Sequence, residues 1–146
     1  MLTRFIRCHR FLHLPLPYRY IHKMHHTVHV PYACAAFYLH PIEALLLDHG
    51  AAFVAAVLFP GMRFWTVVLI QLLLPVRATH EHLGFQFPWD VDTYLTEKTT
   101  HHGIHHLPKG HKFNYATPFF TFTDRLFGTK YPGDEAMKAI RAKKAE

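Results

Sequence analysis

Fifteen of the 146 residues are histidine, and eight of these lie in three short clusters. The first cluster has two histidines four residues apart, and the other two share the pattern HxxHH. Residues three and four apart on a helix share a face, so each cluster is expected to present two or three imidazoles to one point. The eight residues are His9, His13, His22, His25, His26, His102, His105 and His106.

Neutral imidazole is the commonest metal ligand near neutral pH, and it binds zinc, copper, nickel and iron. The eight clustered imidazoles exceed the four ligands that close one tetrahedral zinc site. The clusters therefore predict a site for two metal ions. A histidine-rich surface or scattered core histidines are the alternative, and neither accounts for the repeated spacing.

Two strongly apolar runs, residues 42–59 and 64–79, are separated by the turn signal Pro60-Gly61. Each is close to the length that crosses a bilayer, although two buried helices of a soluble protein would also fit. Fourteen of the sixteen Lys and Arg residues lie outside residues 24–97. This asymmetry follows the positive-inside rule, with both flanks cytosolic. We therefore expect an integral membrane hairpin over about 42–79.

The other expected elements make the fold all-α. Proline cannot continue a helix interior, so Pro15 and Pro17 should separate the first two helices. Pro108 with Gly110 should end the helix that carries the third histidine cluster. The hairpin then brings all three clusters to the same cytosolic membrane face. We expect helices at residues 1–14, 18–29 and 93–106, an irregular segment at 113–131 and a short terminal helix at 134–145.

Further side chains near the clusters are candidate ligands or ligand partners. His82 follows the second apolar run and is expected as a ninth ligand, whereas His40 is either an extra ligand or a capping residue. Metal-bound histidines usually donate their second N–H to a carboxylate or carbonyl, so Glu43, Glu81 and Asp124 are candidate acceptors. The histidines without repeated spacing, expected in solvent or behind the ligands, are His29, His49, His80, His101 and His111.

Composition excludes several classes of function. The net charge is +6, but the basic residues are dispersed and no recognition motif for nucleic acid is present, so anionic lipid headgroups account better for the charge. Cys8 and Cys34 form no CxxC pair, which argues against a disulfide framework or a thiolate metal site. The chain has no serine, which excludes serine-nucleophile catalysis, and no secretory signal is visible.

The segments HRFLH, HKMHH and HHGIHH, with the hairpin between the second and the third, resemble the histidine boxes of the fatty acid hydroxylase (sterol desaturase) superfamily. VPYACAAFYLHPIEALLLD (30–48), EHLGFQFPW (81–89) and KFNYATPFFTFTDRLFGT (112–129) look like sphinganine C-4 hydroxylases. Sterol C-4 methyl oxidases share the boxes and the HLGFQFPW-like stretch. The resemblance extends over about residues 4–132.

The resemblance implies a membrane-bound, O2-dependent lipid hydroxylase of the endoplasmic reticulum. Its hydroxylase domain would occupy residues 1–132, followed by a cytosolic tail at 133–146. The implied reaction is C-4 hydroxylation of sphinganine to phytosphingosine, with an electron donor such as cytochrome b5. Asp124 and Gly128 match a closing DxxxG element that supports the last box. The implied ligands of two iron ions are His9, His13, His22, His25, His26, His82, His102, His105 and His106.

The sequence also departs from the family pattern. Family members carry two further membrane helices and an aspartate before the first box, and Met1 falls within that region, so we expect an N-terminally truncated form that hydroxylates sphinganine poorly or not at all. Gly103 stands where the family often has aspartate, and Gln86 where some sterol enzymes have histidine. A sterol C-4 methyl oxidase, an inactive remnant that keeps the boxes, and a metal-buffering membrane protein are the alternatives.

The last four residues, Lys143-Lys144-Ala145-Glu146, match the dilysine KKxx form that returns membrane proteins to the endoplasmic reticulum. A solvated basic tail is the alternative. Such a signal acts only at a cytosolic C-terminus, which agrees with the charge asymmetry around the expected hairpin. The sequence therefore predicts a multi-pass protein of the endoplasmic reticulum whose histidine boxes face the cytosol.

Overall fold

The computed structural model describes residues 2–50, 61, 63–85, 87–89, 99–116 and 121–133. Within these ranges every regular element is helical and no strand occurs, which confirms the all-α prediction for this part of the chain. The longer helices are α1 (Leu2–Leu12), α5 (Phe64–Glu81) and α7 (Thr99–His106). The short helical turns are α2 (Pro15–Pro17), η1 (Tyr18–His22), η2 (His25–Thr27), η3 (Ala33–Phe37), α3 (Pro41–Glu43), η4 (Ala44–His49) and α8 (Phe122–Leu126).

The N-terminal part is a series of short turns rather than two regular helices. α1 ends at Leu12, and Pro15 begins α2, where its missing N–H costs no hydrogen bond. η1 is π-helical, since Lys23 N–H donates to Tyr18 O at 2.7 Å, and η2 is a 3-10 turn. The expected helix over 18–29 is therefore divided in two, and π turns of this kind occur frequently at functional sites.

The expected hairpin is described in part. Residues 41–49 are helical in α3 and η4, and α5 covers the whole second apolar run, while residues 51–60 lie outside the described part. The tail from residue 134 onward, with its dilysine pair, also lies outside it. Among the helices that the structure describes, none is both long enough and apolar enough to cross a membrane.

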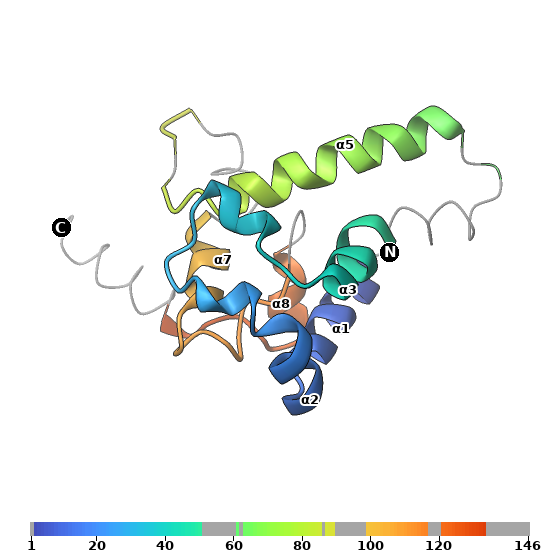
Figure 1. The fold of residues 1–146 in the computed structure, drawn as a ribbon. Coiled ribbons are helices and arrows are strands. Elements are labelled where there is room, and N and C mark those ends of the chain that lie inside the picture. The colour runs from blue at the N-terminus through green and yellow to red at the C-terminus, as the bar shows by residue number, and fades with distance from the viewer. Residues whose placement is uncertain are drawn as a thin grey trace.

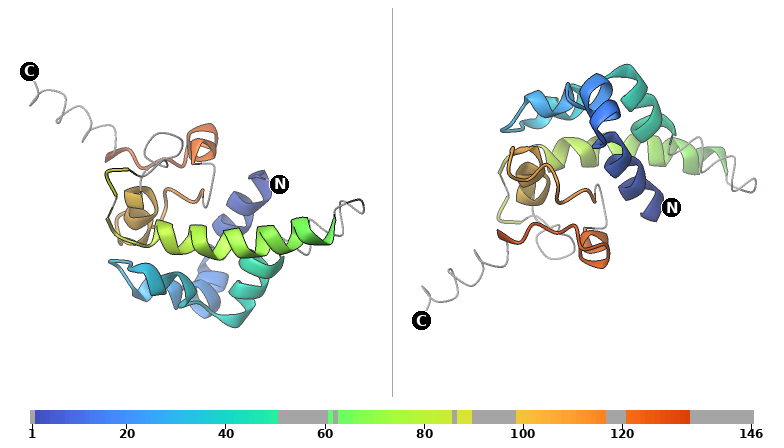
Figure 2. Two further views of the ribbon diagram at one scale, coloured as in Figure 1. Left: turned by 90° about the horizontal axis from the view of Figure 1, so that it is seen from above. Right: turned by 90° about the horizontal axis from the view of Figure 1, so that it is seen from below.

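The long helix α5 connects the two halves of the chain. It contacts η3 and η4 of the N-terminal half and α7 of the C-terminal half, while α1 contacts α8 and η1. Figure 1 shows α5 running along one edge of the molecule, and Figure 2 shows the short turns of the N-terminal half on one side of it and α1 with the C-terminal segment on the other. α8 lies within residues 113–131, so the prediction of an irregular segment there was wrong at this point.

The interior of the described region is mostly polar. Its buried apolar side chains are few, and one small cluster joins Ile6, Tyr115 and Ala116, with Phe127 packed against it. Buried polar groups destabilise a fold unless they are hydrogen-bonded or bind a metal, so the contacts of these groups decide what the interior can do. The fully buried polar side chains with the largest volumes are His22, His26, His105, His106, Glu43, Asn114 and Asp124.

Candidate metal centre

The structure gathers nine histidines into two adjacent groups that could each hold a metal ion. Within each group every ring contributes one nitrogen, and all of these nitrogens lie within 4.8 Å of one another. We call these the five-histidine group, which consists of His9, His13, His22, His26 and His105, and the four-histidine group, which consists of His25, His82, His102 and His106. The nine are the residues that the sequence predicts as ligands, and their binding of a metal stays a prediction.

Each HxxHH motif is divided between the two groups. In the first motif His22 and His26 belong to the five-histidine group, and His25 belongs to the four-histidine group. In the second motif the assignment is reversed, because His105 alone joins the five-histidine group. Each cluster thus presents two imidazoles to one group, as expected, and the third histidine of each HxxHH motif faces the other group. Successive helical residues are about 100° apart, so neighbouring histidines face different directions.

Backbone carbonyls determine which ring nitrogen carries the proton in the five-histidine group. His9 Nδ1 donates to Tyr115 O at 2.8 Å, and His105 Nδ1 donates to Phe113 O at 2.6 Å. A carbonyl oxygen only accepts, so Nδ1 must be the protonated nitrogen of each neutral ring. The Nε2 lone pairs of both rings then point toward the other histidines of the group.

The four-histidine group has the same arrangement. His82 Nδ1 donates to Ala78 O at 2.7 Å, one turn earlier in α5. Two further Nδ1 atoms donate to carbonyls of the N-terminal half, and the contacts are His106 to Val28 O at 3.0 Å and His25 to Tyr38 O at 3.4 Å. These contacts again direct Nε2 inward, which is the tautomer that a metal ligand needs.

The Nε2 atoms approach one another closely. In the five-histidine group, Nε2 of His9 lies 3.2 Å from that of His22 and 3.1 Å from that of His105. In the four-histidine group the corresponding distance is 3.1 Å from His82 to His102 and 3.3 Å from His82 to His25. Two unprotonated nitrogens at this distance repel each other unless a cation lies between them.

These separations fit metal coordination. With metal–nitrogen bonds of about 2.0–2.1 Å, adjacent ligand atoms lie about 3.0 Å apart in an octahedral site and about 3.4 Å apart in a tetrahedral one. The five-histidine group has more ligands than a tetrahedral zinc site takes. The donor set therefore suits an ion that accepts imidazole at a higher coordination number.

The imidazoles are uncharged at neutral pH. Burial lowers the pKa of His9 from its ordinary 6.5 to about 4 and that of His106 to about 3. Burial, followed by repulsion from neighbouring imidazoles, holds the pKa of His25 and His102 well below 6.5. Because the rings stay neutral, their lone pairs are available to a metal ion without prior loss of a proton.

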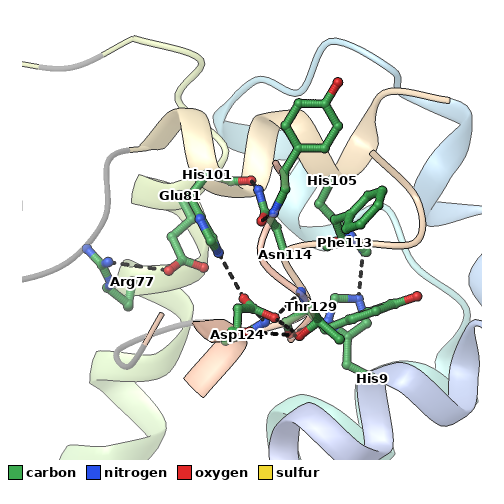
Figure 3. Close-up of polar contacts among 12 residues, drawn as sticks. His9, Arg77, Glu81, His101, His105, Phe113, Asn114, Asp124 and Thr129 are labelled. Carbon is green, nitrogen blue, oxygen red and sulfur yellow. Dashed lines mark hydrogen bonds and ion pairs between the residues drawn. The ribbon is translucent and has the colours of Figure 1, made fainter. Parts of the chain in front are cut away.

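Carboxylates contribute in different ways. Glu43 accepts from His22 Nδ1 at 2.6 Å, and both side chains are buried, so it orients one member of the five-histidine group. Asp124 accepts from His101 Nε2 at 2.9 Å and lies outside both groups (Figure 3).

Two other candidate partners also lie outside the groups. Glu81 pairs with Arg77 of α5 at 3.3 Å (Figure 3), and burial raises the pKa of its carboxyl to about 8. His40 caps α3, since its Nδ1 accepts from Ile42 N–H at 3.2 Å.

The histidines without repeated spacing have separate roles. His101 is buried outside both groups, and its ring donates to Asp124. His111 Nε2 donates to His106 O at 3.2 Å. His29 is exposed, and His80 Nδ1 contacts Arg77. His49 belongs to η4, and its side chain lies outside the description.

Some groups that position the site have no signal in the sequence. The backbone carbonyls that accept from the ligand rings come from residues of unrelated types, so no motif marks them. Asn114, which belongs to the segment beside the five-histidine group, and Thr129, which contacts Asn114 and Asp124, also have no distinctive spacing. Only the positive φ of Asn114, 54°, suits a residue type that tolerates the left-handed region.

The sequence model of fatty acid hydroxylases matches residues 4–129. The chain belongs to the fatty acid hydroxylase family. It is 37% identical over 147 residues to the sphingolipid C4-hydroxylase sur2 of Schizosaccharomyces pombe, with 93% of this chain and 49% of sur2 covered.

Two other relatives have different names. The chain is 36% identical over 126 residues to the very-long-chain aldehyde decarbonylase GL1-9 of Oryza sativa subsp. indica, with 85% of this chain and 48% of that protein covered. It is 37% identical over 125 residues to methylsterol monooxygenase 1 of Rattus norvegicus, with 83% and 40% covered. The chain thus spans about half the length of these family members or less. No solved structure matches it.

Proposed function

We propose that the two histidine groups hold the two iron ions of an O2-dependent lipid hydroxylase. The observation that carries this proposal is the convergence of nine inward-facing imidazoles in two adjacent groups. Imidazole suits iron, and the five-histidine group exceeds a tetrahedral zinc site. Membership of the fatty acid hydroxylase family supports the same chemistry.

The protein residues have a positioning role in this proposal. Iron supplies the oxygen-activating chemistry, and the chain supplies geometry and burial. The carbonyl and carboxylate acceptors orient the rings, and the buried histidine rings limit the access of water. In the overall reaction one oxygen atom enters a C–H bond, and the other becomes water with two electrons and two protons. Cytochrome b5 is the proposed class of electron donor.

The proposed substrate is sphinganine, hydroxylated at C-4 to phytosphingosine. The support is the similarity to sur2, over 93% of this chain, together with the three segments that look like sphinganine C-4 hydroxylases. Oxidation of a sterol C-4 methyl group is the second candidate, favoured by the identity of 37% to methylsterol monooxygenase 1. Both substrates are lipids with a long apolar part.

The proposal includes a membrane location in the endoplasmic reticulum. Helix α5 supports this location, because several of its large apolar side chains have more than half of their surface exposed. Examples are Phe64, Trp65, Leu69 and Leu72. The dilysine tail is the second support, and a Lys143→Ala, Lys144→Ala reporter that remains in the endoplasmic reticulum unchanged would argue against its retrieval role.

The experiment is expression of the chain in cells that lack phytosphingosine synthesis, followed by mass spectrometry of long-chain bases and methylsterols. Formation of phytosphingosine would support the proposed reaction and contradict the expected loss of activity in a truncated form, and the His105→Ala variant is the matched control that should form none. Oxidised methylsterols without phytosphingosine would move the assignment to the sterol reaction. Iron binding without either product would favour a metal-binding protein without oxygen chemistry.

A further inference from the structure

The two carbonyls that accept from His9 and His105 belong to one short segment, residues 113–116. Tyr115 O accepts from His9 Nδ1 and Phe113 O accepts from His105 Nδ1, so both carbonyls face the five-histidine group. The tyrosine ring also packs edge-on against the imidazoles of both histidines, with centroid distances of 5.7 and 5.4 Å. The position of this segment therefore determines the orientation of two candidate ligands.

Asp124 holds the segment from the opposite side. Its Oδ1 accepts from Tyr115 N–H at 3.0 Å and from Thr129 Oγ1 at 2.6 Å. Its Oδ2 accepts from Ala116 N–H and from His101 Nε2, both at 2.9 Å. All four partners donate, and an ionised carboxylate only accepts, so the arrangement uses the full capacity of this fully buried group.

Asn114 completes the connection. Its side-chain amide donates to His101 O at 2.9 Å and accepts from Tyr131 N–H at 2.8 Å, while its backbone N–H donates to Thr129 O at 2.7 Å. His101 is thus bonded by its ring to Asp124 and by its carbonyl to Asn114. The three side chains form one connected unit, which we call the Asp124 clip.

The four-histidine group takes its orienting contacts from elsewhere. Among the described residues, the carbonyls that accept from its Nδ1 atoms lie in α5 and in the N-terminal half. The side-chain Nδ1 of His102, its fourth member, is buried without a hydrogen-bond partner in this part of the chain. The segment that Asp124 holds serves the other group.

We propose that Asp124, with Asn114 and His101, is a positioning unit for the five-histidine group alone, because it fixes the two carbonyls that orient His9 and His105. The inference rests on the proposed metal centre. It means that the Asp124 clip orients ligands of the five-histidine group, whereas other parts of the chain orient those of the four-histidine group. Partners that orient metal-bound histidines typically contribute about 10- to 100-fold to metal affinity.

The test measures metal affinity of the purified full chain in two backgrounds. In His25→Ala the four-histidine group is incomplete, so the metal that remains reports on the five-histidine group. Asp124→Asn, which places an amide N–H against donors, should weaken that metal about 10- to 100-fold. In His105→Ala the remaining metal reports on the four-histidine group, and Asp124→Asn should leave its affinity unchanged.

Two further variants make the result specific. His29→Ala is the control, since His29 is exposed and lies outside both groups and the Asp124 clip, and it should not weaken the metal in the His25→Ala background. Thr129→Val removes one of the four donors to Asp124 and should weaken that metal less than Asp124→Asn does. Far-ultraviolet circular dichroism checks that each variant keeps its helices.

Equal losses in both backgrounds, or no loss with His25→Ala, would overturn the positioning role. If Asp124→Asn loses its helical signal, Thr129→Val decides by the same comparison. A wild-type chain that binds no metal would overturn the proposed function and the inference with it. A wild-type chain that binds metal, with an Asp124→Asn effect that does not depend on background, would overturn the inference alone.

Discussion

His25 and His26 are neighbours in the chain, yet their Nε2 atoms face different partners. His26 Nε2 lies 3.0 Å from that of His22, whereas His25 Nε2 lies 3.3 Å from that of His82, the residue that follows α5. The stacked rings of His26 and His106, with centroids 4.7 Å apart, bring the two groups into contact. Each HxxHH motif therefore connects both halves of the candidate centre, and loss of one histidine should affect one half more than the other.

The first prediction concerns metal content. His25→Ala should lose the metal of the four-histidine group and keep that of the five-histidine group, and His105→Ala should do the reverse. Elemental analysis of purified protein should then fall from about two ions per chain to about one in each variant. His29→Ala is the matched control, because His29 is exposed and lies outside both groups. Full metal content in both variants would show that these groups do not bind metal.

The second prediction concerns Glu43. Its carboxylate accepts from His22 Nδ1 at 2.6 Å in a buried position, and a hydrogen bond to a charged group is stronger than one to an amide. Glu43→Gln keeps the shape and should weaken metal binding by about 10-fold, the lower end of the usual range for such partners. Competition with a chelator measures the change. An affinity equal to that of the wild type would mean that Glu43 does not orient His22.

The third prediction concerns pH and the metal-free chain. Burial lowers the pKa of His9 to about 4 and that of His106 to about 3, whereas both titrate near 6.5 in the unfolded chain. The unfolded chain therefore binds more protons below pH 6.5. The stability that these groups contribute is present above pH 6.5 and is lost as the pH falls toward their folded pKa values.

Each such histidine should lower the free energy of unfolding by up to about 1.4 kcal/mol per pH unit in that window. Thermal unfolding of chelator-treated protein at several pH values between 5 and 8 measures the effect. The melting temperature should be nearly constant above pH 7 and should fall below pH 6.5. A melting temperature that rises on acidification would contradict the burial of these rings as neutral groups.

The fourth prediction compares two glycines near the last histidine box. A methyl group at Gly110 would overlap the carbonyl oxygen of Ile104 in α7, so Gly110→Ala should destabilise the chain by about 1–3 kcal/mol and disturb the adjoining box. At Gly103, also in α7, the same methyl group would meet nothing within 4 Å. Gly103→Ala should stabilise by about 0.5–1 kcal/mol, because alanine favours a helix. Chemical unfolding of both variants tests the opposite signs.

The sequence by itself determined the identity of the candidate ligands. Spacings of three and four residues are a local property, because a helical period places such residues on one side of a turn whatever surrounds it. The two HxxHH motifs and His9 with His13 could therefore be recognised directly. The place of His82 after the second apolar run also predicts it as a ligand, and in the structure it joins the four-histidine group.

Tertiary structure decided how the ligands are divided. Whether His25 or His26 joins a given group depends on how η2, α5 and α7 are oriented, which arises from contacts between distant segments. The acceptors are backbone carbonyls such as those of Phe113 and Tyr115, and every residue has a carbonyl, so no residue type marks them. The Asp124 clip is likewise non-local, because its hydrogen bonds join α7, residues 114–116 and Thr129 only after the chain has folded.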